Sequence, residues 1–115
     1  MIRDTIKNHA DFAASEIDPV AKSNFFLVRA KKAKFKDDAR YGLIVSKKTF
    51  KHAVDRNRAK RVLRDWIAHN ENMMRPEWDY VFVVRRGILD ATRTDGRVAM
   101  KKALHFLKKQ KIDEQ

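Results

Sequence analysis

The chain has 115 residues, of which 43% are hydrophobic and 37% are charged. This length and composition predict one globular domain over residues 1–115 and exclude a disordered chain. The net charge of +12 points to a polyanionic partner, either nucleic acid or an anionic membrane surface. The absence of cysteine excludes disulfides, thiolate zinc sites and a cysteine nucleophile. No apolar run resembles a signal peptide or a membrane span, so we expect a cytoplasmic protein.

A first helix is predicted over residues 3–17, ending before Pro19, because the apolar side chains recur on one stripe: Ile2, Ile6, Ala10, Ala13 and Ile17. Phe12 lies about 120° away from this stripe, and packing on a neighbouring element is its default interpretation.

Two strands are predicted next. Residues 24–30 are rich in aromatic and β-branched side chains, with Phe26 and Val28 on one face and alternate apolar residues on the other. Apolar residues on both faces indicate either burial on both sides or one face used for binding. Residues 40–46 form the second strand, which we expect to pair with the first as a hairpin.

From about Ala53 to residues 70–75 the sequence predicts a helix with two contrasting sides. Its apolar residues fall within about 140° of one another and should face the core: Ala59, Val62, Leu63, Trp66 and Ile67. Cations cover the other side and the preceding connection, with Asn57 among them: Lys47, Lys48, Lys51, Arg56, Arg58, Lys60, Arg61 and Arg64. An ordinary solvated helix face would carry both acidic and basic residues, with many Glu–Lys pairs four residues apart. Such oppositely charged pairs are nearly absent here. Because guanidinium groups hold phosphate oxygens at two points, we interpret this side as a polyanion site.

Residues 79–85 form a nearly continuous apolar strand, the pattern of a central strand, and residues 97–110 a final amphipathic helix. The order helix, strand, strand, helix, strand, helix favours a two-layer α+β sandwich. The strand after the basic helix should join the same sheet beside one of the first two strands.

Ser46-Lys47-Lys48 is followed over residues 53–61 by Ala-Val-Asp-Arg-Asn-Arg-Ala-Lys-Arg. This order, with its Arg-Asn-Arg-x-Lys-Arg core, resembles the signature of the bacterial ribonuclease P protein subunit. The resemblance covers nearly the whole chain, and its other matching segments are residues 10–12, Phe25, residues 41–45 and residues 79–84.

The resemblance implies about four strands in a mixed sheet with three helices, an architecture like that of some ribosomal-protein domains. The fourth, short strand would come from residues 20–22. The basic helix would lie in a left-handed βαβ crossover, against the general right-handed preference.

The resemblance also implies that the protein binds a catalytic RNA and the 5′ leader of precursor tRNA. It would assist the Mg²⁺-dependent endonucleolytic removal of that leader. The RNA would supply the chemistry and hold most of the Mg²⁺, so we expect no catalytic or metal-binding residue in the protein and no required protein partner. The catalytic RNA would contact Lys47, Lys48, Lys51, Arg56, Asn57, Arg58, Lys60, Arg61 and Arg64.

Phe12, Phe26 and Val28 would line a cleft for the single-stranded leader, because unpaired bases stack on apolar and aromatic side chains. Two features depart from the family pattern. Glu16 and Val28 stand where relatives often have aromatic residues, which thins this cleft. Residues 49–52 lack the glycine that many relatives have before the basic helix.

Three other functions would also fit a small basic protein. A protein-only nuclease is disfavoured because the four histidines are scattered along the sequence and the acids show no metal-ligand spacing. His52 more simply donates a hydrogen bond to an RNA phosphate or faces water. A ribosomal component or RNA chaperone explains the charge equally well but leaves the motif order unexplained. A membrane-surface helix is disfavoured because the apolar stripe is needed for the core.

Overall fold

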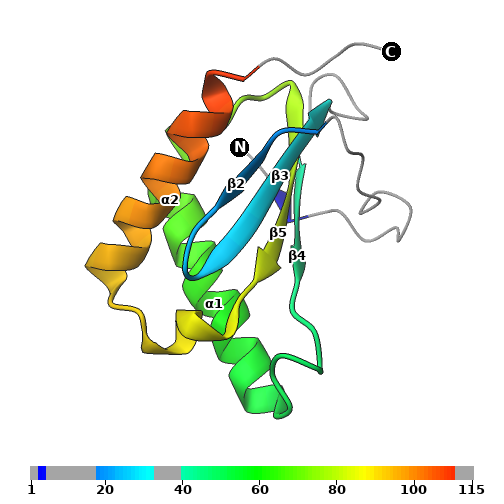
Figure 1. The fold of residues 1–115 in the computed structure, drawn as a ribbon, viewed down its shortest axis with the longest axis vertical. Coiled ribbons are helices and arrows are strands. Elements are labelled where there is room, and N and C mark those ends of the chain that lie inside the picture. Colours follow the sequence, from blue (N-terminus) through cyan, green and yellow to red (C-terminus); the bar gives the residue numbers. More distant parts are fainter. Residues whose placement is uncertain (1–2, 5–17, 33–39, 111–115) are drawn as a thin grey trace.

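The computed structural model describes residues 3–4, 18–32 and 40–110. Its strands are β1 (Arg3–Asp4), β2 (Val20–Lys22), β3 (Phe26–Lys32), β4 (Arg40–Ile44) and β5 (Trp78–Val84). The helices are α1 (Ala53–His69) and α2 (Arg93–Lys108), with two short 3-10 segments, η2 (Glu71–Met73) and η3 (Arg86–Asp90). Both helices lie on the same side of the sheet (Figure 1).

One mixed sheet contains all five described strands, in the order β1-β4-β5-β3-β2. The parallel neighbours β4 and β5 are joined through α1, while β3 is antiparallel to both β5 and β2. The central position expected for residues 79–85 and the short strand expected at residues 20–22 are therefore confirmed. The hand of the β4–α1–β5 crossover stays a prediction.

The predicted hairpin of residues 24–30 and 40–46 is wrong, because β5 lies between β3 and β4 and pairs with both. The physical reason is burial on both faces of β5. Val81 and Phe82 point to opposite faces and are 4% and 0% exposed. A strand that is apolar on both sides is most stable in the middle of a sheet, and there it separates the two earlier strands.

The start of the predicted first helix is also different. Arg3 and Asp4 form β1, whose backbone pairs in parallel with Arg40 and Tyr41 at the outer edge of β4. This pairing satisfies backbone groups that an edge strand would otherwise leave open. The remainder of the predicted helix, residues 5–17 with Phe12 and Glu16, lies outside the described residues.

The core fills the space between the sheet and the two helices. Phe26 of β3 has its ring centroid 6.4 Å from that of Trp66 on α1 and 5.9 Å from that of Phe82 on β5. The predicted apolar side of α1 is confirmed, since Ala59, Leu63, Trp66 and Ile67 are buried. Burial of each large side chain is worth about 1.5–3 kcal/mol, so this contact holds α1 in a fixed rotation about its axis.

The last helix begins four residues earlier than predicted. Thr92 is its N-cap, and the Thr92 hydroxyl accepts a hydrogen bond from the backbone N–H of Asp95 at 3.1 Å. A Thr followed three residues later by an acid is a recognised helix start and was the available sequence signal. No described helix combines the length and the apolar character that crossing a bilayer would require.

Candidate nucleic-acid interface

The connection before α1 is a tight turn tied to the core. The backbone N–H of Phe50 donates to the Ser46 carbonyl at 3.0 Å, and the Ser46 and Thr49 hydroxyls lie 2.9 Å apart. Phe50 is 2% exposed, so its ring anchors the turn. Among the described residues no backbone φ is positive, and this connection therefore needs no glycine. The cationic side chains of Lys47, Lys48 and Lys51 point into solvent.

Arg56 has a structural task. Its Nη1 donates to the Phe50 carbonyl at 2.9 Å and to the Lys51 carbonyl at 3.1 Å, which fastens the turn to the first helical residues. Arg56 is half-buried. The family resemblance implied that Arg56 contacts the catalytic RNA directly, and the structure shows that part of its hydrogen-bonding capacity is used within the protein.

An exposed polar stripe runs along α1 opposite the core. Asn57, Arg61 and Arg64 are exposed and succeed one another at intervals of four and three residues, which places them on one face of the helix. Lys60 lies beside them and is half-buried. Arg58 is exposed at the margin, where its Nη2 donates to the Leu89 carbonyl at 3.4 Å.

Asp65, an acid on the same helix as this stripe, is held by α2. Both terminal oxygens of Asp65 accept from Arg97 of α2, from Nη2 at 3.1 Å and from Nε at 3.3 Å. Among the residues that the structure describes, no carboxylate lies within ion-pair distance of Arg56, Arg58 or Arg61. The exposed guanidinium group of Arg61 can therefore act on an external anion.

Two arginines that the sequence analysis did not select lie beside the basic face. Arg93 lines a cleft of about 370 Å³ together with Arg61 and Asp65. Arg86 lines a smaller cavity of about 80 Å³ with Lys51 and His52. Both arginines come from segments outside α1. The available sequence signals were that Arg86 follows the predicted strand of residues 79–85 and that Arg93 follows the helix-capping residue Thr92.

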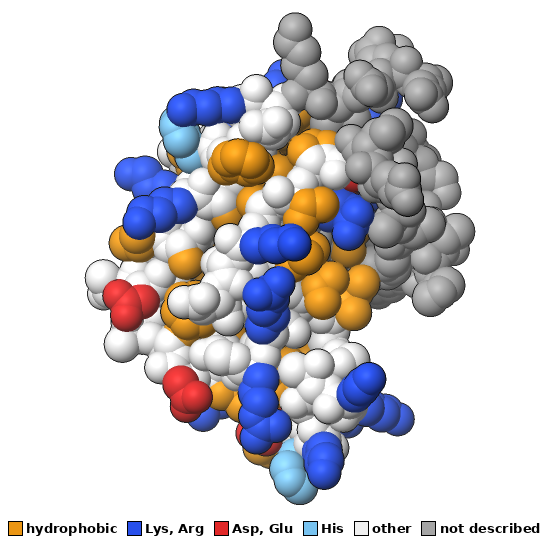
Figure 2. Space-filling model, viewed as in Figure 1, with side chains coloured by type: hydrophobic (Ala, Val, Ile, Leu, Met, Phe, Trp, Pro, Cys, Tyr) orange, Lys and Arg blue, Asp and Glu red, His pale blue; other side chains and the backbone are white. Residues whose placement is uncertain are grey.

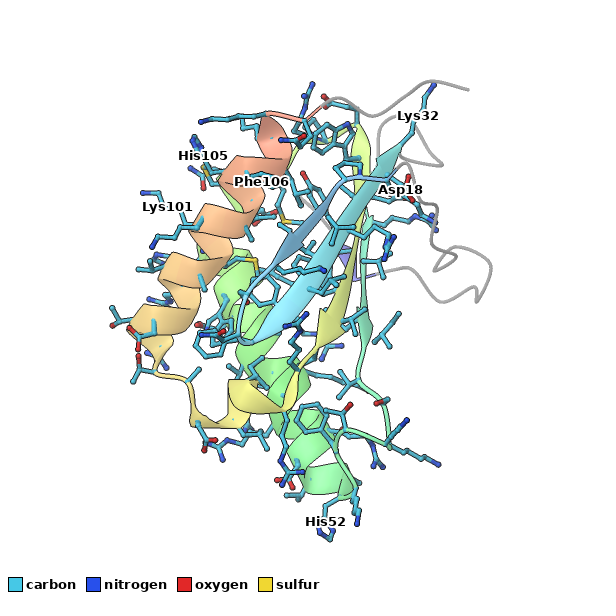
Figure 3. The ribbon with its side chains drawn as sticks, in the orientation of Figure 1. Asp18, Lys32, His52, Lys101, His105 and Phe106 are labelled. Carbon is cyan, nitrogen blue, oxygen red and sulfur yellow. The ribbon has the colours of Figure 1, made fainter. Side chains whose placement is uncertain are left out.

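Figures 2 and 3 show the end of the molecule where α1 begins. His52, labelled in Figure 3, lies at this end, and Lys and Arg side chains lie near it in the space-filling view. His52 is exposed and precedes α1 as its N-cap residue, without a side-chain capping hydrogen bond. This placement fits the interpretation that His52 donates a hydrogen bond to an RNA phosphate or faces solvent.

The prediction that Phe26 and Val28 line a binding cleft is wrong, because both side chains are 0% exposed and face the helices. Alternation along a strand shows which residues share a face but not which face meets the helices. The opposite face carries Leu27, Ile44 and Val83, which are neighbours in the strand register. Val83 is 37% exposed, so this face of the sheet is partly open.

In the described part of the chain, no three His, Asp or Glu side chains converge in a way that could hold a metal ion.

The fold and the basic face define a small α+β domain that presents one cationic helix face to solvent. Residues 3–108 match the family model described as Ribonuclease P, and the chain belongs to this family. The resemblance seen in the sequence is thereby confirmed.

The chain is 41% identical over 87 residues to the ribonuclease P protein component of Marinomonas sp. (strain MWYL1), a match covering 76% of this chain and 64% of that protein. It is 42% identical over 52 residues to the corresponding component of Pseudomonas aeruginosa (strain LESB58), covering 45% and 38%. The chain thus spans less than two thirds of the length of these curated relatives.

The structure is similar to that of the Staphylococcus aureus RNase P protein, with a TM-score of 0.70, 27% identity and coverage of 90% of this chain and 93% of that one. The RNase P protein from Thermotoga maritima gives a TM-score of 0.65 at 22% identity over 77% and 83% of the two chains. The second likeness supports the fold alone. The α+β fold with a mixed sheet is confirmed, with two helices in the described residues.

Proposed function

We propose that this chain is the protein subunit of a cytoplasmic ribonucleoprotein that removes the 5′ leader from precursor tRNA. Its catalytic RNA binds along α1. The observation that carries this proposal is the exposed stripe of Asn57, Arg61 and Arg64 on a helix whose other side is locked in the core. Because the helix cannot rotate and Asp65 is held by Arg97, these donors are already oriented before the RNA arrives.

The contact surface proposed for the catalytic RNA extends from α1 onto the preceding turn. Lys47, Lys48 and Lys51 supply charge near the start of α1, and Arg56 mainly holds the turn in place. Phosphate contacts of this kind position an RNA without reading its sequence.

In this proposal the RNA subunit performs the hydrolysis, and its phosphates hold the Mg²⁺ that the reaction needs. The protein contributes binding and orientation. A wide cationic surface lowers the repulsion between two RNA molecules, which is the main electrostatic obstacle to joining a catalytic RNA and a precursor tRNA.

The leader is proposed to follow the open face of the sheet, on the side opposite α1. Leu27, Ile44 and Val83 offer an apolar surface there, and exposed Arg85 directly follows β5. Phe12 is proposed to border the same path from a third helix within residues 5–17. A left-handed β4–α1–β5 crossover is part of the same proposal.

The test compares Arg61→Gln with Lys108→Gln, a matched charge loss on α2. We expect Arg61→Gln to weaken catalytic-RNA binding about three- to tenfold and to reduce the salt slope by about 0.7–0.9, the value for one lost phosphate contact. Lys108→Gln should change both much less. Affinity is measured by filter binding across a salt series, and cleavage of precursor tRNA is followed at low Mg²⁺.

Equal effects of the two substitutions would contradict the assignment of the RNA to α1. A wild-type protein that gave no stimulation of precursor-tRNA cleavage at low Mg²⁺, but that entered ribosomal subunits, would overturn the proposed function itself.

A further inference from the structure

A groove of about 670 Å³ separates the outer strand β2 from α2. Figure 3 shows Phe106 at the surface between α2 and β2. The groove is lined by two segments that are far apart in sequence: residues 20–25, and the α2 side chains Asp95, Val98, Ala99, Lys102, Ala103 and Phe106.

The backbone of β2 offers hydrogen bonds to this groove. Two hydrogen bonds flank the β2–β3 ladder, from the Ser23 N–H to the Phe26 carbonyl at 2.9 Å and from the Ala30 N–H to the Pro19 carbonyl at 3.1 Å. Hydrogen-bonded pairs alternate in an antiparallel ladder. The N–H and C=O groups of Val20 and Lys22 therefore point away from β3, at the free edge of the sheet.

The helical wall of the groove is apolar although it faces solvent. Val98 is 45% exposed and Phe106 is 51% exposed, and Ala99 lies between the two along the same wall. Four residues in the described chain combine a large apolar side chain with high exposure, and two of them line this groove. Such a concentration of apolar surface beside an open strand edge is typical of a binding groove.

The charged residues of the groove indicate the kind of partner that it can bind. Lys22 on the strand and Lys102 on the helix are both exposed, and Asp95 is the single acid in the described lining. With a chain of net charge +12, a second copy of this protein would meet like charge on both walls. An acidic partner meets complementary charge.

We propose that this groove binds an acidic peptide segment of another protein in extended conformation. The segment adds as a strand to the free edge of β2, places apolar side chains against Val98 and Phe106, and places carboxylates near Lys22 and Lys102. Since β2 offers only two outward-facing residues, backbone pairing alone gives modest affinity, and the apolar and charged contacts supply the rest. This function goes beyond RNA processing and does not use α1.

The probe is a fluorescein-labelled peptide of alternating Glu and Val, and its binding to the full chain is followed by fluorescence anisotropy. The matched control peptide has the same sequence with N-methyl groups on alternate backbone nitrogens, on the edge that would face β2. Methylation removes strand pairing and keeps the charge. We expect it to weaken binding at least about fivefold, which corresponds to the loss of one net hydrogen bond.

Protein variants test the two walls separately. Val20→Pro removes an outward N–H without disturbing the ladder and should weaken binding about fivefold. Lys102→Glu should weaken it about three- to tenfold, whereas Lys101→Glu, an equal charge change directed away from the groove, should have much less effect. Peptide binding should also slow amide hydrogen exchange at Val20 and Lys22.

Three results would overturn this assignment: no binding of the unmodified peptide, equal binding of the N-methylated peptide, or equal losses for Lys101→Glu and Lys102→Glu. Oligouridine that protected the Val20 and Lys22 amides while the peptide did not would show instead that the groove serves single-stranded RNA.

Discussion

Gly96 lies where α2 passes over the indole ring of Trp66. A Cβ at this position would lie 2.0 Å from two atoms of the ring, Cε2 and Cζ2, and the ring is itself 1% exposed. The absence of a side chain thus allows the two helices to approach closely, and this offsets the roughly 1 kcal/mol that glycine costs inside a helix.

We expect Gly96→Ala to lower the free energy of unfolding by about 2–3 kcal/mol, because neither the buried ring nor the helix backbone can move aside cheaply. Urea denaturation measures the change. The control is Thr94→Ala, an exposed neighbour in the same helical turn, which should stay within about 0.5 kcal/mol of the wild type. A Gly96→Ala protein as stable as the wild type would show that the helices are not in this close contact.

Tyr80 links stability to alkaline pH. Burial raises the pKa of Tyr80 to about 12, against an ordinary value near 10, and its hydroxyl accepts a hydrogen bond from the Arg75 N–H at 2.8 Å. Between these values the folded state keeps the proton while the unfolded chain loses it. The stabilisation is therefore complete below about pH 10 and is lost as the pH rises through 12.

The matched comparison is Tyr80→Phe, measured by urea denaturation from neutral to alkaline pH. The wild type should lose about 2–3 kcal/mol more than the variant across this interval, since about two pKa units are involved. Taking the difference removes the contribution of the many lysines. A difference that stayed constant with pH would rule out Tyr80 as the titrating group.

At the scale of elements, local sequence patterns predicted where helices and strands occur better than they predicted which strands pair with each other. The apolar spacing of α1 identified its buried side because one helix carries its own periodicity. The order of strands depends on pairing between distant segments. The apolar pattern of β5 predicted a central position for it, but that pattern could not show that β5 lies between β3 and β4. The same limit misplaced Phe26 and Val28, since alternation leaves open which face meets the helices.

The sequence predicted which residues make up the candidate site, but it predicted only part of how those residues are arranged. The sequence identified Arg61 and Arg64 correctly as exposed cations, but it could not show that Arg56 hydrogen-bonds its own turn. Nor could it show that Arg97, 32 residues away, holds Asp65. Both facts arise from packing between segments that no local spacing relates.

The Asp65–Arg97 pair between α1 and α2 gives a prediction at this scale. Arg97→Gln would free a carboxylate four residues from Arg61, where it can pair with that side chain and repel phosphate. We expect catalytic-RNA binding to weaken about two- to fivefold, with a stability change of under about 1 kcal/mol because the pair is partly exposed. Filter binding and urea denaturation measure the two effects.

The double variant Asp65→Asn with Arg97→Gln has the net charge of the wild type and lacks the freed acid. RNA affinity should return to near the wild-type value. If the double variant bound as weakly as Arg97→Gln alone, Arg97 would contact the RNA directly and the shielding of Asp65 would not be the cause.

At the scale of the whole molecule, the two faces of the sheet have different tasks. One face is covered by α1 and α2 and forms the core. The other remains partly open at Leu27, Ile44 and Val83. A single layer of strands thus separates the proposed catalytic-RNA surface from the proposed path of the leader, so a substitution can affect one RNA contact without the other.

Val83→Glu tests this separation. Val83 is 37% exposed, so the new carboxylate stays in water and the fold should tolerate it, while its charge repels leader phosphates. We expect affinity for precursor tRNA with a leader to fall about three- to tenfold, and affinity for the isolated catalytic RNA to change less than twofold. Val54→Glu, at a 75% exposed position near the start of α1, should show the reverse preference because it adds the same charge beside the basic helix. Binding of precursor tRNA to the holoenzyme and binding of the isolated catalytic RNA to the protein measure the two affinities. If Val83→Glu weakened both RNAs equally, the effect would be one of total charge, and the leader would have to follow another surface.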